Sequence, residues 1–212
     1  MMPLPAVLLE KDGALVEIVP NSADPLQMQF TLGAASALRL WHSSGYRIAV
    51  VSYQPGVALG ACEESVLVDV EDRLREMMGT LGVPLAGFFY CPHPPDGIVA
   101  PFAKPCDCRK PEPGLIQYAA ESLGIDTQRC WVIGDVLDDV EAGGRAGCTT
   151  VLLDNGGETE WRLTPWRIPD YLAHDLLEAA EVVVAAAEAA LTVRASAGRM
   201  ASVSDSTAPS EW

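Results

Sequence analysis

Short apolar runs recur along the chain, and segments long enough for helices separate them. Five of these runs are rich in β-branched or aliphatic residues: Ala6–Leu9, Arg47–Ser52, Gly87–Tyr90, Trp131–Ile133 and Thr149–Leu153. Runs of this length predict buried strands, and strands that alternate with helical segments are typical of a parallel sheet. We therefore expect an α/β fold, with an open, Rossmann-like parallel sheet that carries helices on both faces.

The segments between the runs carry signals for the ends of helices. We predict helices over Leu32–Ser43, Glu63–Leu81, Pro113–Leu123 and, near the C-terminus, Leu172–Ala195. Gly45, Gly82 and Gly124 follow the first three, and glycine is common just after the last residue of a helix. We expect one domain over residues 1–194 and a flexible tail over residues 195–212.

The composition bounds the size of the domain and disfavours some classes of binding partner. The chain has 212 residues, 49% of them apolar, and its 14 Lys and Arg against 29 Asp and Glu leave a net charge of −15. This size suits one globular domain, and this charge disfavours binding to nucleic acid or to an anionic membrane. The first ten residues lack the basic start of a signal peptide, and the apolar stretch 182–193 is too short for a membrane span. We therefore expect a cytoplasmic monomer.

Polar residues directly follow several of the predicted strands. They are Glu10 and Asp12 after the first run, Ser52, Tyr53 and Gln54 at the end of the second, Arg109 and Lys110 ahead of a helix, and Asp135 and Asp139 after a later run. Ligands of open parallel sheets bind at the carboxyl ends of the strands. Carboxylates there suit a hard cation, while a lysine, a serine and backbone N–H groups suit phosphate. Each residue alone is typical of an ordinary turn, but together they predict a site for phosphoryl transfer.

A second constellation combines thiols with an imidazole. Cys91, His93, Cys106 and Cys108 have the residue types and spacing of a tetrahedral zinc site. The loop between the two pairs is rich in proline, so a metal cross-link over residues 91–108 would order it. Buried or disulfide-bonded cysteines with a surface histidine are the alternative. The remaining cysteines show no ligand spacing and are expected in the core: Cys62, Cys130 and Cys148.

These motifs, in this order, resemble the haloacid dehalogenase superfamily of phosphatases over about residues 6–153. The cysteine-rich segment resembles the branch of heptose-bisphosphate and histidinol-phosphate phosphatases. The resemblance implies a fold without a large cap domain. It also implies a Mg²⁺-dependent phosphatase that acts on a small sugar phosphate, most like heptose 1,7-bisphosphate, through a carboxyl-phosphate intermediate. A small phosphorylated sugar is then the expected partner, and Mg²⁺ and Zn²⁺ are the expected cofactors.

The resemblance also implies roles for individual residues. Glu10 stands at the position of the nucleophile, Asp12 is the general acid and base, and Asp139 helps to orient Lys110. Mg²⁺ would be held by Glu10, by the main-chain carbonyl of Asp12 and by Asp135. The other expected catalytic residues are Ser52 and Lys110, and the expected substrate-binding residues are Ser52, Tyr53, Gln54, Arg109 and Lys110. A solvated neighbour of Asp107 is the alternative interpretation of Arg109.

The chain departs from the family pattern at four positions. Glu10 replaces the usual Asp, Ala14 replaces Thr, and Tyr53 and Pro55 replace Asn and Ser. The extra methylene of Glu10 moves its oxygens by about 1 Å, and a misplacement of this size can cost about a hundredfold in rate. Two alternatives therefore stay open: a catalytically impaired pseudophosphatase that binds a phosphorylated ligand or a protein partner, and a zinc-bearing scaffold that binds no phosphate.

Overall fold

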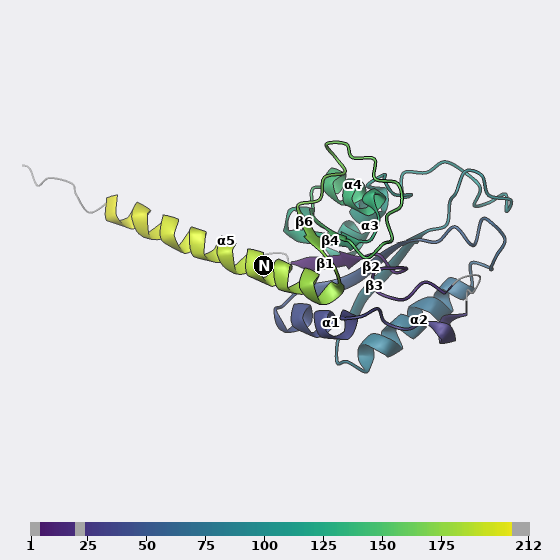
Figure 1. The fold of residues 1–212 in the computed structure, drawn as a ribbon, viewed down its shortest axis with the longest axis horizontal. Helices are drawn as coiled ribbons and strands as arrows, with labels where there is room; N and C mark the ends of the chain where they lie inside the picture. Colours follow the sequence, from purple (N-terminus) through teal and green to yellow (C-terminus); the bar gives the residue numbers. More distant parts are fainter. Residues whose placement is uncertain (1–4, 20–23, 205–212) are drawn as a thin grey trace, which may run out of the picture.

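The computed structural model describes residues 5–19 and 24–204. Six parallel strands form one sheet in the order β3-β2-β1-β4-β5-β6 (Figure 1). They span Ala6–Leu9 (β1), Arg47–Tyr53 (β2), Leu85–Cys91 (β3), Cys130–Gly134 (β4), Thr149–Leu153 (β5) and Tyr171–Ala173 (β6). Five helices and two 3-10 turns connect them: η1 (Pro25–Gln27), α1 (Ala34–Ser43), α2 (Val66–Gly79), α3 (Gly114–Leu123), η2 (Thr127–Arg129), α4 (Leu137–Ala146) and α5 (Leu176–Ser204). The predicted fold class is confirmed.

The alternation along β1 shows how the two faces of the sheet are covered. Val7 and Leu9 pack into a core with side chains of α1, α2 and α5, while Ala6 and Leu8 pack into a second core with side chains of α3 and α4. Because successive side chains of a strand point to opposite faces, a central strand that is apolar at every position has helices on both sides. All four residues of β1 are fully buried.

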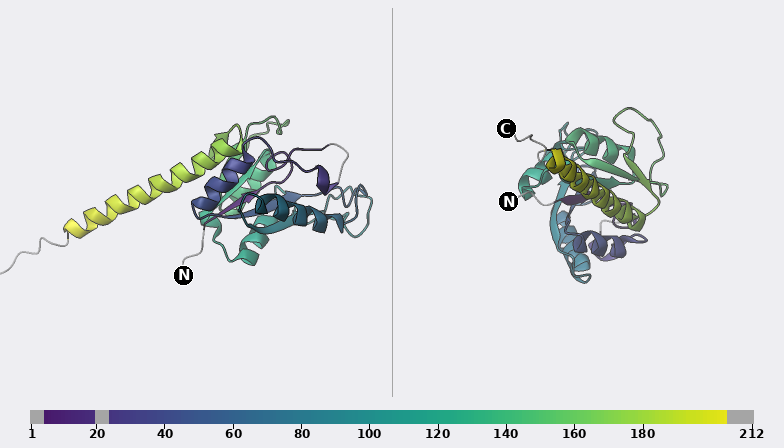
Figure 2. Two further views of the ribbon diagram at one scale, coloured as in Figure 1. Left: turned by 90° about the horizontal axis from the view of Figure 1, so that it is seen from below. Right: turned by 90° about the vertical axis from the view of Figure 1, so that its left-hand side faces the viewer.

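The C-terminal region differs from the sequence prediction. The predicted helix over residues 172–195 is wrong at both ends, because Leu172 lies in β6, where it pairs with Leu152, and α5 runs from Leu176 to Ser204. The start of α5 packs on α1, whereas its far end projects away from the sheet (Figure 2). The boundary predicted at residue 194 falls inside this helix, and residues 205–212 of the predicted tail lie outside the described residues. No helix in the described part of the chain is both long and apolar enough to span a bilayer.

Candidate active site and metal cluster

The carboxyl ends of β1, β2 and β4 meet at one edge of the sheet and surround a cavity of about 270 Å³. Most of the predicted site residues line it: Glu10, Asp12, Tyr53, Arg109, Lys110, Asp135 and Asp139. Ser52 and Gln54 lie beside it and hydrogen-bond to the residues that follow β1. Residues from four separate segments of the sequence therefore converge, as the strand-end pattern predicts.

Lys110 is the central cation of this site. Its ammonium group is buried, donates to the carboxylates of Glu10 and Asp139, and also donates to the carbonyl oxygen of Val51 at 3.1 Å. Burial alone would lower the pKa of Lys110, but the nearby Asp139 and Glu10 carboxylates raise it above its ordinary value. Lys110 therefore stays charged, and the two carboxylates fix where that charge lies.

Glu10 is held through both of its carboxylate oxygens. Oε1 accepts hydrogen bonds from the Ser52 hydroxyl group and, at 2.6 Å, from the backbone N–H of Lys11. Oε2 accepts from Lys110, and the backbone N–H of Tyr53 lies 3.4 Å away. Burial raises the pKa of Glu10, while Lys110 opposes that rise most strongly. The longer side chain is thus accommodated in a fixed orientation next to the lysine.

Asp12 is the more accessible carboxylate, with 39% of its side chain exposed. It forms an ion pair with Lys11 and accepts a 2.8 Å hydrogen bond from the Gln54 amide. The same amide donates to Ser52 Oγ at 2.8 Å. Gln54 therefore connects the carboxylate that faces the cavity with the hydroxyl that holds Glu10.

Asp135 is buried without an ion-pair partner among the described residues. Burial, together with the neighbouring charges of Asp139 and Glu10, raises the pKa of Asp135 to about 7. Two glycines flank its carboxylate, because a Cβ atom on Gly13 or on Gly157 would lie 2.2 Å from Oδ2. A divalent cation bound there would relieve the repulsion, so the donor set fits Mg²⁺.

The carboxylates of Glu10, Asp12 and Asp135 do not form a compact cluster of side-chain ligands. Over residues 5–19 and 24–204, only the cysteine–histidine group brings three or more such ligand atoms within 4.8 Å of one another. Glu10 turns toward Lys110 and Ser52, and Asp12 turns toward Lys11 and Gln54. This arrangement is compatible with a site in which Asp12 contributes its main-chain carbonyl, as the resemblance implies.

The four predicted zinc ligands come together in one cluster. The Sγ atom of Cys108 lies 3.1 Å from that of Cys91 and 3.3 Å from that of Cys106, and 3.4 Å from Nδ1 of His93. Burial raises the pKa of the Cys91 and Cys108 thiols, so both stay protonated without a metal ion, and a metal that binds here would displace their protons. Three sulfurs and one imidazole nitrogen form a donor set that can bind a metal ion and that fits tetrahedral zinc.

Arg109 and Tyr53 form a pair at the wall of the cavity. The guanidinium carbon of Arg109 lies 5.2 Å from the centre of the Tyr53 ring, within the range of a cation–π contact. Burial raises the pKa of Tyr53, so its hydroxyl stays protonated at neutral pH. Tyr53 ends β2 beside Cys91 of β3, and Arg109 directly follows Cys108. The metal cluster therefore lies close to both members of the pair.

The sequence interpretation missed the segment that follows β5. Asn155 donates from its side chain to the carbonyl oxygen of Gly13 at 2.8 Å, and Gly157 lines the cavity. Glu158 accepts from the backbone N–H of Leu137 at 2.7 Å, at the start of α4. The signal available in the sequence was the Asn155-Gly156-Gly157 turn directly beyond a predicted strand.

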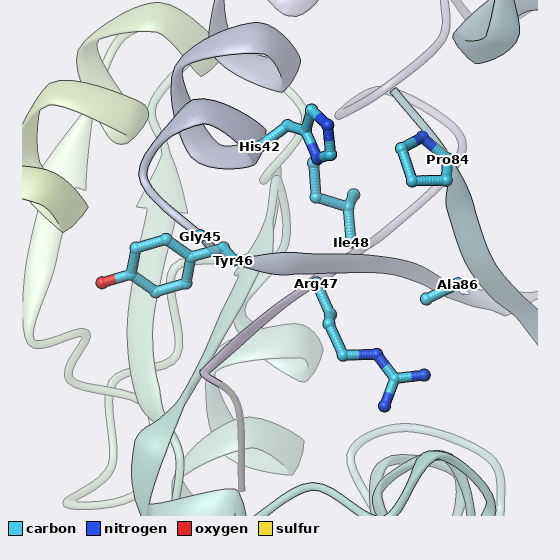
Figure 3. Close-up of a pocket in the computed structure, with 7 residues that line it drawn as sticks. All are labelled: His42, Gly45, Tyr46, Arg47, Ile48, Pro84 and Ala86. Carbon is cyan, nitrogen blue, oxygen red and sulfur yellow. The ribbon is translucent and has the colours of Figure 1, made fainter. Parts of the chain in front are cut away.

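Another cavity, of about 380 Å³, opens at the opposite end of β2 (Figure 3). His42 and Arg47 line it, but they lie on opposite sides of the strand, and Arg47 donates to the Leu123 carbonyl at 2.6 Å. Polar groups do not converge there, so the cavity at the carboxyl ends of the strands is the candidate active site.

Comparisons with known proteins agree with this geometry. A family model described as HAD-hydrolase-like matches residues 107–179. The D-glycero-β-D-manno-heptose-1,7-bisphosphate 7-phosphatase of Yersinia pestis is 32% identical over 155 residues, which are 73% of this chain and 82% of that protein. The D-glycero-α-D-manno-heptose-1,7-bisphosphate 7-phosphatase of Photorhabdus laumondii is 33% identical over 149 residues, or 70% of this chain and 81% of that protein.

A solved structure supports the fold. The D,D-heptose 1,7-bisphosphate phosphatase from B. bronchiseptica, complexed with magnesium and phosphate, superposes with a TM-score of 0.70 at 23% identity. The match covers 85% of this chain and 98% of that one. Both proteins thus share the arrangement of the sheet and helices along nearly their whole length.

Proposed function

The chain belongs to the haloacid dehalogenase-like hydrolases, in the family of the heptose-1,7-bisphosphate 7-phosphatases, and we propose from this premise that it is a phosphatase of small phosphorylated sugars. Its substrate is most like heptose 1,7-bisphosphate, on which its relatives are named to act. One observation carries the proposal: buried Lys110 joins Glu10 to Asp139 beside Asp135, a carboxylate without an ion-pair partner in the described residues. Such a set of charges is costly in the absence of a ligand.

The proposed chemistry has two steps. Glu10 attacks the phosphorus atom and forms a glutamyl phosphate, and the bond from phosphorus to the sugar oxygen breaks. Asp12, with its partly exposed carboxyl group, gives a proton to that oxygen, so the sugar leaves as an alcohol. Asp12 then takes a proton from a water that attacks the acyl phosphate, which releases inorganic phosphate and restores both carboxyl groups.

The charged side chains of the site have supporting roles. Lys110 stabilises the negative charge on the transferring phosphoryl group, and Asp139 keeps its ammonium group in place. Ser52 holds Glu10 and, with Gln54 and the neighbouring backbone, contacts the phosphate oxygens. Glu10, the main-chain carbonyl of Asp12 and Asp135 would hold Mg²⁺, which would neutralise phosphate charge.

We assign zinc to the cluster of Cys91, His93, Cys106 and Cys108, where it would act structurally. The donor set supports zinc over a hard cation, because thiolates are soft ligands. The cluster cross-links a loop that has few backbone ladders and ends directly before Arg109 and Lys110. Zinc would therefore hold the segment that delivers the two basic side chains to the cavity.

Phosphate release from heptose 1,7-bisphosphate in the presence of Mg²⁺ tests the proposal, with fructose 1,6-bisphosphate and glucose 6-phosphate as comparison substrates. The unaltered protein is compared with Glu10→Asp and, as the negative control, with Asp12→Asn. We expect turnover by the unaltered protein, a rate up to about a hundredfold higher in Glu10→Asp, and loss of activity in Asp12→Asn. Turnover by Glu10→Asp alone would show that Glu10 silences the natural protein, and inactivity of both would refute the assignment.

A further inference from the structure

Arg109 is the basic residue of the cavity wall that remains available to bind a ligand. The described residues that line the cavity contribute two basic side chains, Lys110 and Arg109. Lys110 is committed to Glu10 and Asp139. No ion pair of Arg109 with a carboxylate occurs within the described residues, although Asp12 and Asp138 line the same cavity.

The Tyr53 ring explains how Arg109 keeps this position. The guanidinium carbon of Arg109 lies over the Tyr53 ring, and a cation–π contact uses the charge of the group rather than its N–H donors. These donors suit a second anion, because a planar guanidinium binds phosphate oxygens in pairs. The ring thus holds the cation near acidic residues without using up its hydrogen-bonding capacity.

Tyr53 can hold Arg109 in place because the main chain of each residue is fixed by its neighbours. Tyr53 is the last residue of β2, in register with Cys91 of the neighbouring strand, while Arg109 is attached to Cys108 in the same metal cluster. The two side chains consequently approach each other from β2, which pairs with the strand that carries Cys91, and from the segment that follows Cys108. Asparagine, the family's usual residue here, offers no aromatic face, so the contact is a feature of this chain.

We propose that Tyr53 is a positioning residue that holds Arg109 ready for the second phosphate of the substrate and so makes the enzyme selective for sugar bisphosphates over sugar monophosphates. This proposal rests on the proposed phosphatase function. One phosphate would occupy the end of the cavity near Lys110, and the other would meet Arg109. Selectivity then depends on the aromatic face of residue 53 rather than on its hydroxyl group.

A double-mutant cycle tests the proposal with heptose 1,7-bisphosphate and heptose 7-phosphate as substrates. Tyr53→Leu removes the ring, and we expect it to raise KM for the bisphosphate by about two- to thirty-fold, the range of a cation–π contact, with a smaller effect on kcat and on the monophosphate. Tyr53→Phe, the matched control, keeps the ring and should keep the bisphosphate preference. In an Arg109→Ala background, Tyr53→Leu should change KM no further.

Three outcomes would overturn the proposal: equal effects of Tyr53→Leu on the two substrates, a loss of preference in Tyr53→Phe, or additive effects of the Tyr53 and Arg109 changes. If the unaltered protein hydrolyses neither substrate, the proposed function fails. A binding measurement then tests the positioning role of Tyr53 separately. The measured quantity is then the rise in melting temperature with each sugar phosphate in the presence of Mg²⁺. A larger rise with the bisphosphate that Tyr53→Leu removes and Tyr53→Phe retains supports the positioning role, whereas equal rises in the unaltered protein refute it.

Discussion

Replacement of Asp135 by asparagine should stabilise the metal-free protein while it removes activity. The pKa of Asp135 rises from 3.8 to about 7 because the carboxylate is buried and lies near Asp139 and Glu10. At 1.36 kcal/mol per pKa unit, this difference corresponds to about 4 kcal/mol at a pH above 7. Water that enters the cavity relieves part of this cost, so we expect a gain of about 2–4 kcal/mol for Asp135→Asn.

The sign of the pH dependence follows from the direction of the shift. The folded protein holds the Asp135 proton more tightly than the unfolded chain does, so ionisation of this group costs stability as the pH rises from about 4 to about 7. The advantage of Asp135→Asn is therefore complete above pH 7 and disappears as the pH falls toward 4. Added Mg²⁺ should reduce the advantage, because it binds the natural carboxylate and stabilises only the unaltered protein.

Denaturant unfolding of zinc-loaded protein, dialysed into magnesium-free buffer at about pH 8 and at about pH 5, measures the effect. Asp154→Asn is the matched control, because it removes the same charge from an exposed position at the end of β5. If Asp135→Asn is no more stable than the unaltered protein at pH 8, the argument that the ionised Asp135 carboxylate destabilises the fold is refuted. An equal gain in Asp154→Asn would assign the effect to the net charge of −15 instead.

Three other changes have defined outcomes. Lys110→Met leaves Glu10 and Asp139 buried without their cation, so unfolding should require about 3–5 kcal/mol less and phosphate release should cease, as denaturant titration and a phosphate assay would show. Cys106→Ser should release the bound metal, measured by elemental analysis, and should destabilise the fold by about 3 kcal/mol, the value for losing a cross-link across a loop of about 15 residues. Asn155→Ala removes the side-chain bond behind the Asp12 turn and should lower kcat by about tenfold with little change in melting temperature, whereas an unchanged kcat would contradict its positioning role.

The sheet and much of the candidate site could be predicted because their signals are local. An apolar run marks each of the first five strands, and the polar residue that follows a run lies at the carboxyl end of the sheet. The zinc ligands follow the same logic, since Cys-x-His and Cys-x-Cys each place two donors within three residues. β6 could not be found in this way, because its three residues are not a long apolar run and are ordered by pairing with β5.

Contacts with the main chain explain the part of the site that escaped prediction. Asn155 acts on the carbonyl oxygen of Gly13, which lies 142 residues away in the chain, and any residue type would offer the same carbonyl. Gly157 leaves room for the Asp135 carboxylate, because a Cβ atom at position 157 would clash with it. Charged side chains that contact one another can be recognised by their residue types. A main-chain carbonyl is common to all residue types, and a glycine does not indicate which side chain lies next to it. The turn after β5 therefore borders the same cavity as the motif residues do, whereas the sequence marks it only as an Asn-Gly-Gly turn beyond a strand.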